Sequence, residues 1–172
     1  MAKLRKAISY RRIERPYTRR SKYKNKNYVK SAPVNKIVRY DMGALNKQFP
    51  LKFDLISMSN IQIRHNSIES ARMSSLRHLE KTLGKTGFNM KIRIYPHHIL
   101  RENPLATGAG ADRMSTGMQK AYGKPIGLAA QVRVGQPVIS VQVPEKQEET
   151  AKLALKRASY KLPCSFRIVK VK

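Results

Sequence analysis

The segment from residue 101 to residue 125 holds the chain's clearest grouping of residues that could act on a ligand. It reads RENPLATGAGADRMSTGMQKAYGKP, and its large apolar residues are isolated from one another. Glycines in such a loop let the backbone approach a phosphate closely or adopt positive φ. Position 113 is Arg where a dinucleotide-binding fingerprint needs a third glycine, and Lys124 is followed by Pro125 instead of Ser or Thr. The pattern therefore does not support nucleotide hydrolysis.

Other residues with catalytic or metal-binding chemistry are scarce. His97 and His98 are adjacent, so on a strand their rings point to opposite faces and cannot share a metal. Cys164 is the only cysteine, which excludes an internal disulfide and a thiolate metal cluster. The chain has only ten Asp and Glu residues from which to build an acid–base pair. We expect no enzymatic activity, no metal and no cofactor.

The charge balance indicates the kind of partner. Thirty-six Lys and Arg against ten Asp and Glu give a net charge of +26 in 172 residues. Such a surplus opposes compaction, whereas neutralising phosphates releases counterions and favours binding, so the composition predicts a nucleic-acid partner. No run of 18 apolar residues exists to span a bilayer, and the N-terminus lacks the apolar stretch of a secretory signal. We therefore expect an intracellular protein.

Residues 1–52 are interpreted as a basic N-terminal arm. They contain sixteen Lys and Arg against Glu14 and Asp41, with no sustained hydrophobic period. Tyrosines lie between the cations, at Tyr10, Tyr17, Tyr23, Tyr28 and Tyr40. Such interleaving lets guanidinium groups contact phosphates while the rings stack on bases. Packing onto the domain is favoured instead for Tyr40 and stays open for Tyr10 and Tyr17. Up to about Lys30 the arm is expected to be disordered until RNA binds.

From residue 53 the pattern predicts one α+β domain, 53–172, with a mixed or antiparallel sheet and two helices packed on it. Strands are expected at 53–58, 61–64, 89–95 and 166–171, and a hairpin joins 128–134 to 138–143 through Gly135-Gln136-Pro137. Asn66 and Glu69 suggest a capping box at the start of a helix that ends at Gly84 or Gly87.

Two apolar stripes support the two helices. The first contains Ile68, Ala71, Leu76, Leu79 and Leu83. Arg72 falls inside that stripe, where a side chain reaching out to solvent is favoured over an inward hydrogen-bonding role. The second helix, ended by Pro163, has Glu145, Glu148 and Glu149 at its start and the basic Lys156, Arg157 and Lys161 near its end, as the helix dipole favours. Its stripe is Ala151, Ala154, Leu155, Ala158 and Leu162.

Several motifs together resemble one protein family. The run from Gly108 to Met118 with Gly123-Lys124-Pro125 resembles the signature of the universal large-subunit ribosomal proteins that border the transfer-RNA cleft, the sixteenth in bacteria and the tenth in archaea and eukaryotes. Supporting segments occur in order along nearly the whole chain, among them Arg19-Arg20, Asp41-Met42-Gly43, Ala71-Arg72-Met73, Ile92 to His98 and Ala154 to Ala158. The arm with Pro16-Tyr17-Thr18-Arg19, and the lack of an aromatic extension after Lys172, resemble the archaeal form.

The resemblance implies an α/β hammerhead-like fold and a cytoplasmic, ribosomal location. The implied partners are 23S-type ribosomal RNA, including the region near 5S RNA, the acceptor arm of transfer RNA and neighbouring ribosomal proteins, with no membrane and no homo-oligomer. The residues expected to bind ribosomal RNA are Lys3, Arg5, Lys6, Tyr10, Arg11, Arg12, Arg15, Tyr17, Arg19, Arg20, Lys22, Lys24, Arg64, Arg93, Lys120 and Lys124. The loop expected to face transfer RNA contains Arg101, Thr107, Gly108, Ala109, Gly110, Ala111, Asp112 and Arg113.

Two other functions stay open. A non-ribosomal RNA-binding assembly or translation factor would share the basic charge but would cycle on and off the ribosome. An RNA-modifying enzyme is disfavoured, because the chain lacks a recognisable cofactor loop, a metal cluster and paired acids. For Arg101, a role in bracing the loop against neighbouring RNA is the alternative to a contact with transfer RNA.

Overall fold

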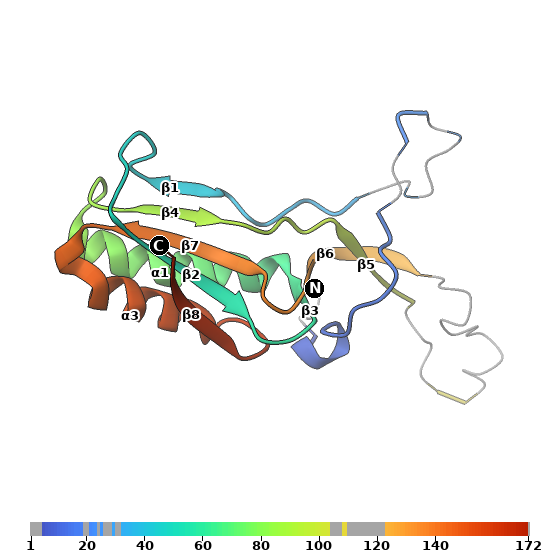
Figure 1. The fold of residues 1–172 in the computed structure, drawn as a ribbon. Helices are drawn as coiled ribbons and strands as arrows, with labels where there is room; N and C mark the ends of the chain where they lie inside the picture. Colours follow the sequence, from blue (N-terminus) through green and yellow to red (C-terminus); the bar gives the residue numbers. More distant parts are fainter. Residues whose placement is uncertain are drawn as a thin grey trace.

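The computed structural model of the chain describes residues 5–18, 21–23, 25, 29, 32–103, 108–109 and 123–171. These residues form two antiparallel sheets and two α-helices, which confirms the predicted α+β class (Figure 1). The strands are β1 (Asp41–Gly43), β2 (Leu51–Ser57), β3 (Ile61–Arg64), β4 (Asn89–Ile92), β5 (His98–Glu102), β6 (Lys124–Val132), β7 (Pro137–Val143) and β8 (Phe166–Val171). The helices are α1 (His65–Leu83) and α3 (Glu148–Ser159), with 3₁₀ turns η1 (Ala7–Ser9) and η3 (Glu145–Gln147).

The larger sheet has the strand order β1-β4-β7-β2-β8, and both helices cover one of its faces (Figure 1). Alternate residues of the strands point at the helices: Phe53 and Leu55 of β2 and Met90 of β4 are fully buried there. The predicted stripes meet them, with Ile68, Ala71 and Leu79 from α1 and Ala151, Ala154, Leu155 and Ala158 from α3. This apolar layer is the main core.

The smaller sheet, β3-β6-β5, lies at the opposite end of the molecule from the start of α3 (Figure 1). Its central strand β6 has four consecutive buried residues, Gly127 to Ala130, followed by the partly exposed Gln131 and the buried Val132. A strand covered on both faces reads as a continuous apolar run. The sheet is therefore packed on both sides and supports the arm and the 101–125 loop.

The predicted hairpin between 128–134 and 138–143 is wrong. The turn itself forms, since the Gln136 N–H donates to the Arg133 carbonyl at 3.2 Å and Gly135 has a φ of +80°. The strands on either side then separate, β6 pairing with β3 and β5 while β7 lies between β4 and β2. The Gly135 N–H donates to the Ser57 carbonyl at 2.9 Å, so the turn is held by the end of β2. Local turn chemistry predicts a reversal of the chain but not the partner of each strand.

Helix α1 begins one residue before the predicted capping box. Arg64 occupies the N-cap position without a side-chain cap bond, so the capping box is wrong. Glu69 instead accepts two hydrogen bonds from the Arg72 guanidinium, at 2.8 and 2.6 Å. Arg72 is 8% exposed and also lies 3.4 Å from the Met42 sulfur, so the inward role holds and the favoured outward one is wrong. The helix ends at Gly84, as predicted.

The other elements match more closely. α3 has Glu148 and Glu149 in its first turn and Lys156 and Arg157 in its last, and β8 confirms the expected final strand. β4 ends at Ile92, three residues earlier than expected, although the buried and exposed alternation continues to Tyr95. The sheet also begins before residue 53: β1 and the start of β2 lie inside the 1–52 segment that was interpreted as an arm.

Candidate nucleic-acid interface

Residues 5–18 run along the smaller sheet and are held by their backbone. The Gln62 N–H donates to the Arg11 carbonyl and its Nε2 donates to the Tyr10 carbonyl, both at 2.9 Å. Gln131 Nε2 donates to the Glu14 carbonyl at 2.8 Å. Gln62 and Gln131 face each other in the register of β3 and β6 and bond to one another at 3.1 Å. The segment is thus fixed while the side chains of Arg11, Arg12 and Arg15 are exposed.

Tyr17 is the second point of attachment. Its N–H donates to His98 Nδ1 at 2.9 Å, and its carbonyl accepts from the Ile99 N–H at 3.2 Å. Its ring packs beside Val29, Ile99 and Leu128. Burial lowers the pKa of His98, with Glu14 raising it and Arg101 lowering it to smaller extents. His98 is therefore neutral near pH 7, as an acceptor at Nδ1 requires.

Arg101, at the end of β5, lies over the ring of Tyr17. The guanidinium carbon is 3.9 Å from the ring centroid, a close cation–π contact. Packing against the domain, one of the two possibilities left open for Tyr17, is therefore what the structure shows. The contact also connects the arm to the base of the 101–125 loop.

The first residues of the described arm meet β3 and β5 around a hollow of 420 Å³. Arg5 pairs with Glu102, and Arg64 Nη2 donates to the Arg5 carbonyl at 2.6 Å. The Arg64 guanidinium also lies 5.6 Å from the centroid of the Tyr10 ring. Burial is the main cause that raises the pKa of Tyr10, and nearby Glu102 adds to it. Like Tyr17, Tyr10 is packed against the domain in this structure.

The 101–125 loop leaves the domain from a narrow neck. β5 and β6 pair up to Glu102↔Lys124, so the loop outside the strands is residues 103–123. A side chain at Gly123 would come within 3.0 Å of the Glu102 carbonyl carbon and 3.2 Å of the Asn103 nitrogen. Gly108 has a φ of +133°, a conformation that favours glycine, and both it and Ala109 are exposed.

The structure gathers ten of the predicted RNA-binding and loop residues around the smaller sheet. They are Arg5, Lys6, Tyr10, Arg11, Arg12, Arg15, Tyr17, Arg64, Arg101 and Lys124. Two lie apart: Lys22 contacts Tyr23, and Arg93 lines a hollow on the helix-free face of the larger sheet. Gly108 and Ala109 are described as exposed residues of the loop. The remaining predictions fall outside the described residues, namely Lys3, Arg19, Arg20, Lys24, Lys120, Thr107, Gly110, Ala111, Asp112 and Arg113, as does Tyr28 of the arm.

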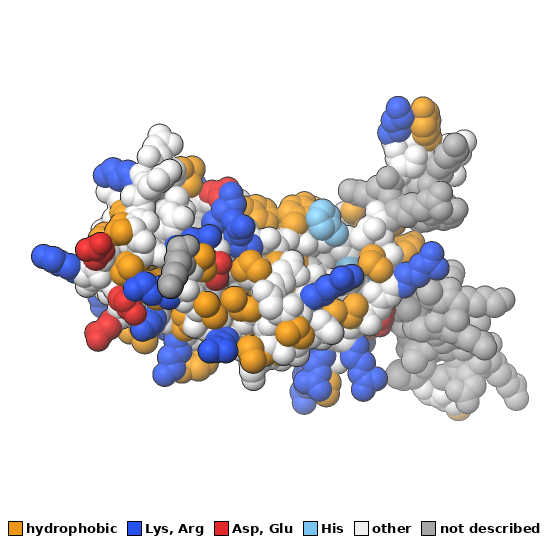
Figure 2. Space-filling model, in the orientation of Figure 1, with side chains coloured by type: hydrophobic (Ala, Val, Ile, Leu, Met, Phe, Trp, Pro, Cys, Tyr) orange, Lys and Arg blue, Asp and Glu red, His pale blue; other side chains and the backbone are white. Residues whose placement is uncertain are grey.

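Acidic side chains gather at the other end of the molecule. In Figure 2 most of them lie toward the start of α3, where Glu145, Glu148 and Glu149 are close in sequence, while Lys and Arg side chains project below the smaller sheet. Such separation creates a positive surface that attracts a polyanion. Tyr40 does not belong to this surface: it stacks on Tyr95 at 5.5 Å and accepts a bond from Asn35, so its predicted packing role is confirmed.

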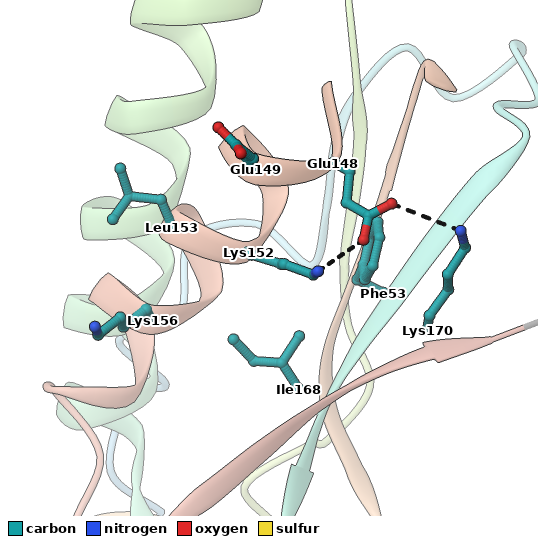
Figure 3. Close-up of a pocket in the computed structure, with 8 residues that line it drawn as sticks. All are labelled: Phe53, Glu148, Glu149, Lys152, Leu153, Lys156, Ile168 and Lys170. Atoms are coloured by element: carbon teal, nitrogen blue, oxygen red, sulfur yellow. Dashed lines mark ion pairs between the residues drawn. The ribbon is translucent and has the colours of Figure 1, made fainter. Parts of the chain in front are cut away.

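A hollow of 640 Å³ lies between α3 and β8 (Figure 3). Glu148 bridges Lys152 at 2.7 Å and Lys170 at 3.6 Å, and these contacts lower the pKa of its carboxyl. Glu149 points away from the bridge in Figure 3. A carboxylate held between two lysines, without a second carboxylate directed at it, does not form an acid–base pair.

Within the described part of the chain, no group of three or more His, Cys, Asp or Glu side chains could hold a metal ion. None of its helices is both long and apolar enough to cross a membrane.

The sequence reasoning missed the residues that dock the arm. Gln62 is 3% exposed inside an otherwise apolar strand, and Gln131 interrupts the buried run of β6. A glutamine at a buried or half-buried strand position is a signal that some backbone or side chain must satisfy its amide. On this argument, Gln62 and Gln131 predict that another segment of the chain lies over the smaller sheet.

The fold and this surface define a strongly basic α+β protein that presents arginines on an anchored arm. The chain belongs to the family of ribosomal protein L16p/L10e, which matches residues 14–169. It is similar to the large ribosomal subunit protein uL16 of Methanococcus maripaludis strain S2, with 45% identity covering 98% of this chain and 95% of the relative. The uL16 proteins of Methanoculleus marisnigri (45% identity; 95% and 93% covered) and Archaeoglobus fulgidus (42%; 95% and 90%) are similar over nearly the same length. All three relatives are archaeal, as the predicted form requires.

Proposed function

We propose that this protein is a structural component of the large ribosomal subunit that binds large-subunit ribosomal RNA and helps to form the transfer-RNA cleft. Membership in the L16p/L10e family supports the first part of this proposal, that the protein is a component of the large ribosomal subunit. As part of that subunit, the protein is located in the cytoplasm. The anchored arm is the observation that supports RNA binding. It presents Arg11, Arg12 and Arg15 to solvent on a backbone that Gln62 and Gln131 hold in place.

Anchoring favours binding because less conformational entropy is lost when the phosphates arrive. Fixing a residue's backbone costs about 1–2 kcal/mol of conformational entropy. Hydrogen bonds to Gln62, Gln131 and His98 already order part of the arm within the protein, so less of this entropy is lost on binding. Three neighbouring exposed arginines can then contact successive phosphates without a search for the correct backbone path. Opening of the arm up to about Lys30 in the absence of RNA stays a prediction, and it would require these docking bonds to break.

The 101–125 loop is proposed to contact the acceptor arm of transfer RNA. Its neck is fixed by β5 and β6, Gly123 allows strand backbones to approach there, and Gly108 adopts positive φ at an exposed position. Arg101 stacks on Tyr17 within the protein, so we do not assign it a direct contact with transfer RNA. Arg113 is then the arginine proposed to contact transfer-RNA phosphate.

Two experiments test the proposal. The first is sedimentation of the protein with large subunits washed in high salt, where close to one copy for each subunit is expected. A protein that binds only at low salt and is lost on washing would instead support an assembly or translation factor.

The second experiment is deletion of residues 107–112, which should leave incorporation into subunits intact and slow transfer-RNA accommodation. Wild-type rates of transfer-RNA binding and dipeptide formation on fully loaded subunits would overturn the role of the loop.

We propose no catalytic group for this protein. Two carboxylates near the basic surface are engaged in ion pairs, Glu102 with Arg5 and Glu69 with Arg72. The proposed role is to position RNA through contacts alone.

A further inference from the structure

A second basic surface lies on the helices, away from the arm. It is a groove of 570 Å³ between α1 and α3, lined by Ser70, Met73, Ser74, Arg77, His78, Lys81, Arg157 and Lys161. The α1 residues recur at intervals of three and four, so they share one face of that helix. Arg157 and Lys161 supply the opposite wall, from the end of α3 and the turn that follows it.

Among the described residues, no ion pair neutralises the positive charge of this groove. Its lining includes four cations and no carboxylate. The ion pairs among the described residues engage other cations, namely Arg5, Arg72, Lys91, Lys152 and Lys170. Glu80, the acid of α1 nearest in sequence, lines a different hollow together with Arg72. The hollow in Figure 3 differs from this groove, because there the Glu148 carboxylate pairs with two of the lining lysines.

One of the four cations is fixed in position. Arg157 Nη1 lies 3.1 Å from His78 Nδ1, on the facing helix. The pKa of His78 is lowered by burial and, to a smaller extent, by Arg157 and Lys81, so the ring is neutral near pH 7 and can accept this hydrogen bond. The contact uses one of the five N–H donors of the guanidinium. His78 is therefore a positioning residue for Arg157.

We infer that this groove binds the sugar–phosphate backbone of a second RNA segment, separate from the one that contacts the arm. The inference rests on the proposed function, which makes RNA the polyanion. Arg77 and Lys81 are about 6 Å apart along the helix axis, so they can contact different phosphates of one strand. The groove has hydroxyl and cationic groups but no Tyr, Phe or Trp for stacking, which favours backbone contacts over base recognition.

Distance separates the two surfaces. Arg64 precedes α1 beside the arm, and Arg77 lies thirteen residues further along the chain, about 20 Å along the helix axis. A single phosphate cannot contact both, so the two surfaces bind different phosphates. In this inference these phosphates belong to two RNA segments, with α1 extending from one to the other, and footprinting distinguishes two segments from one.

The test compares two double variants that remove equal charge. Lys81→Gln with Lys161→Gln alters the groove through exposed side chains, and Lys146→Gln with Lys152→Gln alters the start of α3 outside it. Binding to large-subunit ribosomal RNA is measured against salt concentration, and hydroxyl-radical footprinting maps the protected RNA. If each groove lysine contacts one phosphate, the log–log salt slope falls by about 1.4–1.8 in the groove variant. The control keeps the wild-type slope.

The footprint should lose protection at a segment that stays protected when Arg11, Arg12 and Arg15 are replaced. Arg157→Lys retains the charge and should keep the slope, whereas Arg157→Gln should lower it. An equal slope for the groove and control variants, or loss of the same footprint in groove and arm variants, would overturn this inference while the proposed function stands. If the wild-type protein failed to bind the RNA at all, both would be overturned.

Discussion

Replacing Arg11, Arg12 and Arg15 with Gln should reduce the salt dependence of RNA binding without unfolding the protein. The three side chains are exposed, and the bonds that dock the segment use backbone carbonyls that the substitutions keep. Each neutralised phosphate contributes roughly 0.7–0.9 to the slope of log affinity against log salt, so the slope should fall by about 2–3. Over a fourfold rise in salt, wild-type affinity should drop about 25-fold more than that of the variant.

The assay is equilibrium binding to large-subunit ribosomal RNA at several salt concentrations, with thermal unfolding as a check on the fold. The charge-matched control is the triple Lys variant, which should keep the wild-type slope. A Gln variant that folds, binds and retains the full slope would refute the reasoning, because the arm would then not be in contact with phosphates.

Three further predictions concern the fold. Glu69→Gln leaves the nearly buried Arg72 without its carboxylate, so the free energy of unfolding in urea should fall by about 2–4 kcal/mol, whereas Lys152→Gln at the exposed Glu148 pair should change it little. Gly43→Ala places a Cβ against the Phe88 carbonyl at a φ of +85° and should cost at least about 2 kcal/mol, whereas Gly135→Ala, at +80° in open space, should cost about 1 kcal/mol; equal losses would contradict the steric argument. The pKa of His98 is lowered in the fold, so its stabilising contribution is complete above about pH 6.5 and is lost as the pH falls through the lowered value. Unfolding curves from pH 7 to 5 should show a smaller loss of stability for His98→Phe than for the wild type, and equal losses would show that His98 is not a source of the pH dependence.

The sequence predicted the elements whose signals are local. α3 has its acids, bases and apolar stripe within one segment of chain, and the structure reproduces all three except at the ends. Glu145 lies in η3, and the helix ends at Ser159, before the predicted Lys161, Leu162 and Pro163. The final strand and the end of α1 at Gly84 are equally local and were predicted correctly.

Features that depend on distant partners were not predictable in the same way. The strands flanking Gly135 have hairpin chemistry but enter different sheets, because each is required by neighbours far away in sequence. The position of Glu69 fits a capping box, but its carboxylate instead pairs with the nearly buried guanidinium of Arg72, which requires a counter-charge. For the candidate site, composition identified the cations but not the glutamines that anchor them, nor the pairing of α1 with α3 that creates a groove.

The placement of the few acids explains how so basic a chain can both fold and bind a polyanion. Among the described residues, ion pairs involve Glu69, Asp41, Glu102 and Glu148, and each of these acids lies where two elements meet or a helix begins. There a carboxylate reduces repulsion between cations that folding brings together. Arg11, Arg12 and Arg15 of the arm and the cations of the interhelical groove receive no such compensation from the ion pairs of the described chain. The repulsion left at these surfaces opposes folding of the free protein and is relieved when phosphates bind, so RNA binding and stability of the fold should increase together.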